Sequence, residues 1–246
     1  MLAIFCAALL RSSSIGCARG LKISPLTCNI CVNITMKTID INGYSIDIQD
    51  KPVSLSFSGG ADSALLLYIL LANTTETLHV YTFASRLKQF RNALAATRVL
   101  TACCSLTGNY HVEHHIVYID QQSPEAMYPS MRSQLARDGS SCLYTAMTRL
   151  PPQSVQEGFC QQLPPQLIDL RNDQTVRPLY YERNTRYTPF INLNKQDIAR
   201  MYLHLDLRSR LYPLTRSCEG PLGQWDKHCG SCWWCDERAW AFGTLE

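Results

Sequence analysis

Residues 53–67 read VSLSFSGGADSALLL, a short β-prone run followed by a Gly-Gly turn and the start of an apolar run. A strand that turns sharply through glycines into a buried helix points several backbone N–H groups at one spot, where the helix dipole adds about half a positive charge. The glycines leave room for phosphate oxygens, and the serines beside them can donate hydroxyl hydrogen bonds. Asp62 can cap the helix or help to hold a magnesium ion. The stretch therefore predicts a phosphate-binding loop.

An ordinary turn is the alternative interpretation of the same letters, because Gly, Ser and Asp are common turn residues. The position of the turn between a β-prone run and an apolar helix favours phosphate binding over that alternative. The Walker pattern GxxxxGK[ST] is absent, since no lysine follows the glycines.

The segments around this loop predict alternating strands and helices. Residues 39–48 (IDINGYSIDI) alternate in polarity around an Asn-Gly pair, which is typical of a β-hairpin. Beyond the loop, strands are expected at 78–83 and 114–119, with an apolar helix over 63–71. A second helix is indicated by apolar residues at helical spacing, namely Phe90, Leu94, Thr97, Leu100 and Cys104. This order predicts an α/β fold with a parallel sheet and right-handed crossovers.

Residues 194–205 (NKQDIARMYLHL) predict a further helix. Asn194 is a suitable N-cap, and Asp197 lies near the positive helix end. The expected apolar face consists of Ile198, Met201, Tyr202 and Leu205. Residues 123–165, rich in Pro, Ser, Gln and Arg, allow no firm assignment beyond a short element near CLYTAMT.

The composition is that of a globular chain, with 246 residues, 46% hydrophobic and 17% charged. A net charge of +3 forms no basic stripe, so no stable nucleic-acid partner is expected. No run approaches the roughly eighteen apolar residues of a membrane span, so no membrane association is expected. Twelve cysteines, unevenly clustered, favour metal binding over disulfides and hence a reducing, cytoplasmic location.

The first residues form a separate part of the prediction. MLAIFCAALL resembles the apolar part of a secretory signal only partially, because no positive charge precedes it. We interpret residues 1–35 as a poorly structured extension or a misassigned start, with Met36 as the true beginning. The CNIC pair, Cys28 and Cys31, lies in this extension and is a weak metal or redox pattern on its own.

Four cysteines near the end have the spacing C-x10-C-x2-C-x2-C: Cys218, Cys229, Cys232 and Cys235. Two CxxC turns and one loop can gather four thiolates into a tetrahedron around zinc, as in structural sites. Reduced core cysteines are the plainer alternative, but three of them at strict three-residue spacing beside glycine and polar residues favour metal. His228 could replace a ligand, although four cysteines suffice. Of the other histidines, His114 and His115 should face opposite sides of a strand, as structural or surface groups.

The loop motif SGGxDS resembles that of the N-type ATP pyrophosphatases (the PP-loop superfamily), which bind the pyrophosphate portion of ATP and adenylate an acceptor. Together with the pattern SC-x10-CGxCxxCxxR-x-x-AF, which ends in Arg238 and Phe242, it resembles the 7-cyano-7-deazaguanine synthase (QueC-like) family. The TPFINLNKQDIARMYLHLDL segment is similar to a family segment as well. Two motifs in the family's order are far more specific than either alone.

The resemblance implies an ATP-dependent carbon–nitrogen ligase that makes 7-cyano-7-deazaguanine from 7-carboxy-7-deazaguanine and ammonia in queuosine biosynthesis. It implies an adenine nucleotide alpha hydrolase-like domain over 36–210 and a zinc-binding tail over 211–246, with ATP, Mg²⁺ and Zn²⁺ as cofactors. Asp62 and Ser63 are the expected catalytic residues, and a homodimer is compatible with the sequence. The expected ATP-binding residues are Phe57, Ser58, Gly59, Gly60, Ala61, Asp62, Ser63, Ala64, Leu65, Leu66 and Leu67.

Two departures from the family leave the acceptor open. YTFASRLKQF stands where the family has a Tyr-Gly-Gln stretch, and SSCLYTAMTRLPP replaces a Pro-Arg-Asn segment, with Arg149 as a substitute. The alternatives are another carboxylate or amide acceptor, a tRNA thiolation enzyme, or an ATP-binding zinc module without catalysis. Thiolation would require a reactive cysteine among Cys103, Cys104 and Cys142.

Overall fold

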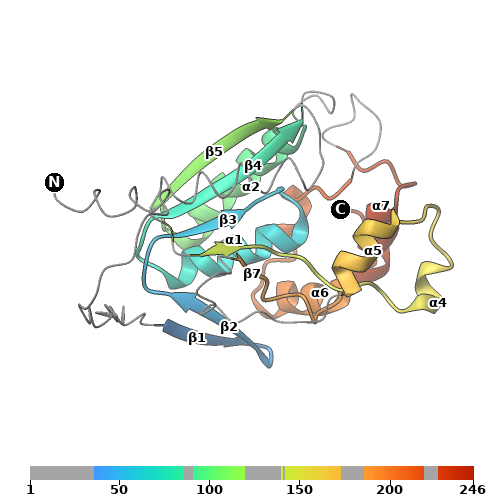
Figure 1. Cartoon of the computed structure of the whole chain (residues 1–246), viewed down its shortest axis with the longest axis horizontal. Coiled ribbons are helices and arrows are strands. Elements are labelled where there is room, and N and C mark those ends of the chain that lie inside the picture. Colours follow the sequence, from blue (N-terminus) through green and yellow to red (C-terminus); the bar gives the residue numbers. More distant parts are fainter. Residues whose placement is uncertain (1–35, 86–90, 120–139, 141, 173–185, 219–226) are drawn as a thin grey trace, which may run out of the picture. The chain divides into compact units, whose positions relative to one another are not determined.

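The core of the protein is a five-stranded parallel β-sheet with the order β5-β4-β3-β6-β7. The computed structural model describes residues 36–85, 91–119, 140, 142–172, 186–218 and 227–246. The strands of this sheet are β3 (Val53–Ser56), β4 (Leu78–Ser85), β5 (Val112–Ile119), β6 (Leu143–Tyr144) and β7 (Arg186–Tyr187), shown in Figure 1. Every pair of neighbours in the sheet is parallel. The predicted α/β fold with a parallel sheet flanked by helices is confirmed.

The predicted hairpin precedes the sheet. Strands β1 (Met36–Ile41) and β2 (Tyr44–Gln49) pair antiparallel, and Ile41 faces Tyr44 across the turn. Asn42 and Gly43 both have positive φ, 54° and 81°. Consecutive left-handed residues match the strand twist in two-residue hairpins, which is why Asn-Gly is favoured there.

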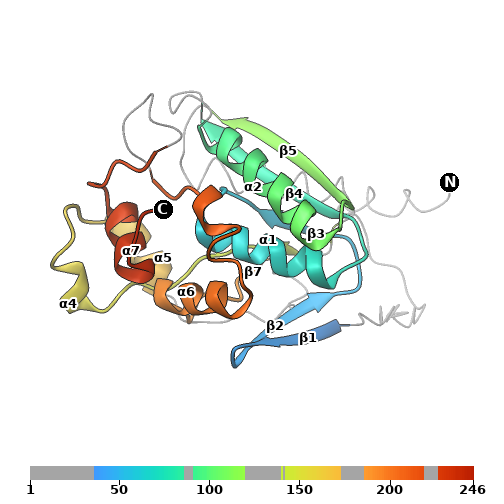
Figure 2. The same ribbon diagram turned by 180° about the vertical axis from the view of Figure 1, so that it is seen from behind.

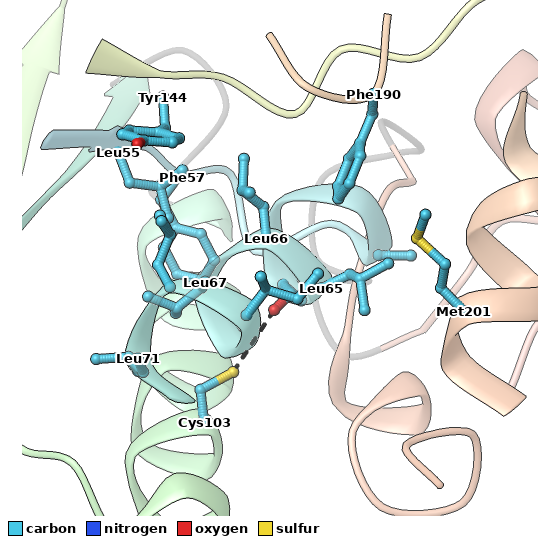
Figure 3. Packing of buried hydrophobic residues seen from close by; sticks show 14 of the residues in the cluster. Leu55, Phe57, Leu65, Leu66, Leu67, Leu71, Cys103, Tyr144, Phe190 and Met201 are labelled. Atoms are coloured by element: carbon cyan, nitrogen blue, oxygen red, sulfur yellow. Dashed lines mark hydrogen bonds between the residues drawn. The ribbon is translucent and has the colours of Figure 1, made fainter. Parts of the chain in front are cut away.

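Helices α1 (Ala61–Asn73) and α2 (Arg91–Thr107) lie together against one face of the sheet (Figure 2). Helix α1 is buried almost all round, as its continuous apolar sequence predicts. Its leucines Leu65, Leu66 and Leu67 are fully buried in the main core, where Figure 3 shows them among side chains of the sheet and of the C-terminal half. The thiol of Cys103 on α2 lies 3.7 Å from the Ala64 carbonyl oxygen, so the two helices are in direct contact.

The buried face of α2 differs in part from the predicted one, of which Cys104 is buried, Leu100 packs against the core and Phe90 lies outside the described residues. Leu94 is 49% exposed and Thr97 is exposed, whereas the small residues Ala95 and Ala96 are buried together with Val99. Small side chains permit a close approach of helix backbones, and here the glycine turn before α1 lies against α2. The larger leucine is therefore turned towards solvent, which helical spacing of apolar residues alone does not reveal.

The C-terminal half supplies helices α4 (Gln153–Gln156), α5 (Pro165–Asn172), α6 (Lys195–His204) and α7 (Trp233–Phe242), and the 3-10 helix η2 (Tyr212–Leu214). The predicted cap of α6 is confirmed, since Asn194 and Asp197 form a reciprocal capping box. The predicted apolar face of α6 packs into the main core. The segment that allowed no assignment contributes β6, α4 and the start of α5 within its described part.

The predicted extension over 1–35, with Cys28 and Cys31, lies outside the described residues. Among the helices of the part that is described, none combines the length and apolar character needed to cross a membrane.

Candidate functional site

The predicted phosphate-binding loop lies at the switch point of the sheet. From β3 the chain winds outward through β4 and β5 on one side, and later through β6 and β7 on the other. In open α/β sheets the crevice beyond the carboxyl ends of the strands at such a point is where ligands bind. Residues 57–60 leave β3 at that end and lead directly into α1. Topology and motif therefore indicate the same location.

The two loop serines form a small hydrogen-bonded unit around the start of α1. The Ser58 and Ser63 hydroxyl oxygens are 3.1 Å apart, and the Ser63 hydroxyl donates to the Gly60 carbonyl at 3.2 Å. The Gly60 amide donates to the Ser58 hydroxyl at 3.3 Å. Gly60 is the N-cap of α1 and, as a glycine, supplies no side-chain cap of its own. The start of α1 thus keeps the partial positive charge that favours an anion.

Gly59 allows the tight contact between the loop and α2. Its φ is +76°, and a Cβ atom on it would lie 2.7 Å from the Ala96 amide nitrogen and 2.9 Å from the Ala96 Cα. Both the left-handed backbone and this contact exclude a side chain. Gly60 is also crowded, because a Cβ there would lie 3.1 Å from the Ser217 hydroxyl oxygen.

The other predicted nucleotide-binding residues are placed behind the loop. Phe57, Ala61 and the run from Ala64 to Leu67 have side chains that are at most 2% exposed in the core. They support the loop from beneath, and any contact with a nucleotide is left to their backbone. The polar members Ser58, Asp62 and Ser63 lie together on the loop and the first turn of α1.

Asp62 takes part in a chain of charges that the sequence did not reveal. Its carboxylate pairs with Lys195, the first residue of α6, instead of capping α1. The Lys195 Nζ lies 3.9 Å from a carboxylate oxygen of Glu237 on α7, and Glu237 pairs with Arg171 on α5. The Lys195 side chain is only 5% exposed and that of Glu237 is fully buried. Buried charges are stable only when paired, so these ion pairs hold α1, α5, α6 and α7 together beside the loop.

One oxygen of Asp62 stands apart from this pairing. Its Oδ1 atom is buried and has no hydrogen-bond partner among the described residues, while Oδ2 contacts Lys195. A buried carboxylate oxygen without a donor is well suited to a cation, because Mg²⁺ prefers oxygen ligands. This one oxygen is therefore a suitable ligand for the predicted magnesium ion.

The segment that leads into the cysteine cluster supports the loop from the other side. The Arg216 amide donates to the Gly59 carbonyl at 2.9 Å, and the Tyr202 hydroxyl donates to the Ala61 carbonyl at 2.8 Å. The Ser217 hydroxyl lies 3.5 Å from the Ala61 amide nitrogen. Cys218, the first cysteine of the cluster, follows at once. The cluster is thereby linked to the loop by the backbone hydrogen bond of Arg216 and by the side chain of Ser217.

The four predicted metal ligands come together. Three sulfur–sulfur distances are 3.5 Å for Cys232 and Cys235, 3.8 Å for Cys229 and Cys235, and 4.0 Å for Cys218 and Cys232. Four thiolates at about 2.3 Å from zinc in a tetrahedron would be about 3.8 Å apart. The amide of Cys229 donates to the Cys218 sulfur at 3.2 Å, and that of Ser231 to the Cys229 sulfur at 3.5 Å. The sulfur geometry and the backbone amides that donate to the sulfurs fit zinc.

The electrostatics of the cluster also favour a cation. Hydrogen bonds with Cys218 and Cys232 raise the pKa of Cys235, since crowded sulfurs disfavour further negative charge. Burial lowers the pKa of the neighbouring His228 to about 4, so this imidazole is neutral at physiological pH. His228 is not one of the four converging ligand groups. The alternative of a histidine ligand is therefore unnecessary.

The three cysteines required by the thiolation alternative are all buried. Burial raises the pKa of Cys103 and of Cys104, and it raises the pKa of Cys142 to about 12. Reactive cysteines have exposed thiols with lowered pKa values. These three positions do not have the properties of a persulfide carrier.

Arg149 lines a shallow hollow of about 320 Å³ together with Pro152, Gln156, Asn172 and Asn194. Its backbone is fixed by the Arg171 guanidinium, which donates to the Arg149 carbonyl at 2.9 Å. The same guanidinium belongs to the chain of charges behind the loop. A larger hollow of about 490 Å³ lies between the end of α6 and Glu246 and includes none of the predicted site residues.

Comparison with known proteins agrees with the sequence motifs. Residues 180–246 match the family model described as "Queuosine biosynthesis protein QueC". The matched segment carries α6, the four cysteines and α7. The match confirms the predicted resemblance over the segment that contains the cysteine pattern. No curated protein matches the chain.

Two solved structures are similar in fold. An NH3-dependent NAD synthetase from Campylobacter jejuni subsp. jejuni NCTC 11168, in complex with the nitrate ion, is 15% identical, with a TM-score of 0.36 over 65% of this chain and 66% of that chain. An NMN synthetase from Francisella tularensis is 14% identical, with a TM-score of 0.38 over 78% of this chain and 76% of that chain. The chain thus spans just under two thirds of the first structure's length.

Proposed function

We propose that this QueC-like protein of the PP-loop superfamily uses ATP to convert 7-carboxy-7-deazaguanine and ammonia into 7-cyano-7-deazaguanine. The observation that carries the proposal is the match of residues 180–246 to the QueC family. It is supported by the loop after β3, which presents hydroxyls and a helix start at the sheet's switch point. The described cysteines form no disulfide with one another, which fits the proposed cytoplasmic setting.

The proposed reaction proceeds through two adenylations. The substrate carboxylate attacks the α-phosphorus of ATP, and the bond to pyrophosphate breaks. Ammonia then attacks the acyl carbon, AMP leaves, and an amide results. The amide oxygen is adenylated by a second ATP, and loss of AMP and of the nitrogen-bound protons yields the nitrile. No redox partner is needed, because ATP supplies both leaving groups.

The loop residues have distinct parts in this scheme. The Ser58 hydroxyl, and the Ser63 hydroxyl once it turns from the Gly60 carbonyl, donate hydrogen bonds to the pyrophosphate portion, together with backbone amides at the start of α1. Asp62 offers its unpartnered Oδ1 atom to the metal. Mg²⁺, when bound, would neutralise charge that develops on the phosphates.

Lys195 has a proposed part that the motif did not suggest. Its ammonium is buried beside Asp62 at the loop, and Glu237 balances it from behind. A buried cation close to the bound phosphates would stabilise negative charge on the departing pyrophosphate. Glu237 is then a positioning residue, because it holds Lys195 without reaching the loop.

The zinc that fits the four cysteines has a structural part in this proposal. A closed all-cysteine shell leaves no open coordination position for a reactant. The cluster instead fixes Cys218 and the short segment before it, in which the Arg216 amide donates to the Gly59 carbonyl. Loss of zinc should therefore disturb ATP binding indirectly.

The test is an incubation of the zinc-loaded chain with ATP, magnesium, ammonium and 7-carboxy-7-deazaguanine. AMP and pyrophosphate are followed by chromatography, and the base by mass spectrometry. We expect a nitrile product and AMP. An Asp62→Asn variant should lose AMP formation, whereas the exposed Asp50→Asn variant should keep it.

Each outcome separates the parts of the proposal. Formation of AMP without any change in the base would contradict 7-carboxy-7-deazaguanine as the acceptor, while cleavage of ATP to AMP would still stand. An amide product without nitrile would contradict the second adenylation. Absence of AMP in a chain that still binds zinc would contradict the enzymatic proposal and support a nucleotide-binding module.

A further inference from the structure

Three side chains of the types that ligate metals converge on the face of the sheet opposite α1 and α2. Along β4, Leu78 and Val80 point into the core under these helices, so the alternate residue His79 points to the other face. Glu113 on β5 pairs in register with His79 and therefore shares its face. His115 follows Glu113 by two residues, the spacing that keeps side chains on one face of a strand.

The distances among these groups fit a metal ion better than a hydrogen bond. One carboxylate oxygen of Glu113 lies 3.3 Å from the Nδ1 atom of His79 and 3.6 Å from the Nε2 atom of His115. Hydrogen bonds of this kind are usually about 2.7–3.2 Å long. Ligand atoms at about 2.0–2.2 Å from zinc in a tetrahedron would be about 3.4 Å apart. All three ligand atoms lie within 4.8 Å of one another.

Both imidazole nitrogens lack another use. The Nδ1 atom of His79 and the Nε2 atom of His115 are buried and have no hydrogen-bond partner among the described residues. Buried polar atoms are normally satisfied, so two such atoms aimed at one carboxylate oxygen require an explanation. A cation between them would satisfy both nitrogens and the carboxylate together.

Stacking holds the two rings in position. The His115 ring stacks on Tyr81 with centroids 4.8 Å apart and on His79 with centroids 5.9 Å apart. The side chain of His79 is 10% exposed, that of His115 is 35% exposed and that of Glu113 is 58% exposed. The inner ligand is thus fixed, and the outer ones leave an entry path and room for a water molecule.

We propose that His79, Glu113 and His115 form a zinc site distinct from the cysteine cluster, with water as the fourth ligand. Two imidazoles and one carboxylate suit zinc, whereas Mg²⁺ and Ca²⁺ prefer oxygen ligands alone. The site joins β4 to β5, which is the edge strand among the described strands. It lies near the start of β4, away from the carboxyl ends where the ATP loop lies. The proposal is therefore independent of the proposed reaction.

Zinc content of matched variants tests this site. The full-length wild type, His115→Ala and the control His111→Ala are dialysed against one zinc buffer, and bound zinc is measured by mass spectrometry. His111 is exposed and lies just before β5, so it controls for loss of an imidazole. The twelve cysteines of the chain can bind zinc in every variant, so the result is the difference in zinc content between variants. We expect His115→Ala to bind one zinc fewer than the wild type and His111→Ala.

Two further measurements keep the test decisive. Glu113→Gln preserves the shape of a largely exposed side chain, so it should fold normally and still lose the same equivalent of zinc. Cobalt substituted into the chain should lose an absorption component in Glu113→Gln while the thiolate-to-cobalt charge-transfer bands of the cysteine site persist. Equal zinc content in the wild type, His115→Ala and Glu113→Gln would overturn the proposal.

Discussion

A single methyl group at position 59 should destabilise the protein through two separate effects. The φ of +76° is strained for any residue with a Cβ atom, which costs about 1–2 kcal/mol. The new methyl would also lie 2.7 Å from the Ala96 amide nitrogen, and forcing atoms into a packed region costs a further 1–3 kcal/mol or so. We expect Gly59→Ala to lower the free energy of unfolding by about 2–5 kcal/mol, a large share of the usual 5–15 kcal/mol.

Gly108→Ala is the matched control for the steric part. Gly108 also has a positive φ, +69°, but nothing lies within 4 Å of the position that its Cβ would take. Only the backbone cost of about 1–2 kcal/mol should remain there. Urea unfolding of both variants, monitored by circular dichroism, gives the two values, and ATP titration should show lost affinity only for Gly59→Ala. Equal destabilisation of the two variants would refute the packing of the loop against α2.

Three further expectations follow from the site. Cys232→Ser should lose zinc and unfold at a lower temperature, measured by metal analysis and calorimetry; an unchanged zinc content would contradict the four-cysteine site. Lys195→Met should lower the free energy of unfolding, measured by urea unfolding, by about 3–5 kcal/mol, because the largely buried Asp62 carboxylate loses its partner. Adding Asp62→Asn should recover part of this loss, and additive losses would argue against the pair. Burial raises the pKa of Cys142 from 9.0 to about 12, so an alkylating reagent should modify this thiol only after unfolding, whereas the exposed Cys160 should react at once. Since the thiol loses its proton at lower pH in the unfolded chain than in the folded one, the free energy of unfolding should fall as pH rises from 9.0 to about 12.

Local features of the fold could be predicted from the sequence. Asn42-Gly43 determines its turn through the backbone preferences of two adjacent residues. Asn194 and Asp197 cap their helix within a single turn. The four cysteines could be grouped because three of them lie within seven residues, and CxxC turns bring their sulfurs together.

Features that depend on distant segments could not be predicted in this way. Asp62 was expected to act as a cap or a magnesium ligand, but its salt-bridge partner Lys195 is 133 residues away in sequence. The letter pattern of α2 favoured Leu94 as an inward residue, whereas the approach of Gly59 selects the alanine face. The sequence predicts His115 only as a structural or surface group, because the register of β4 against β5, which places His79 beside it, cannot be read from the sequence.

The order in which the chain emerges during synthesis gives the contacts of the loop a further meaning. The loop is made early, but the partners of Gly59, Ala61 and Asp62 are Arg216, Tyr202 and Lys195, and Glu237 behind them comes later still. At about 5–20 residues per second, the ribosome needs roughly ten to thirty seconds to add that stretch. A nascent chain can therefore build most of the sheet while the loop at residues 57–60 is still unsupported. A chain released before its last helix would have an incompletely supported loop, so under the proposed function premature termination should yield an inert protein instead of one that consumes ATP without a product.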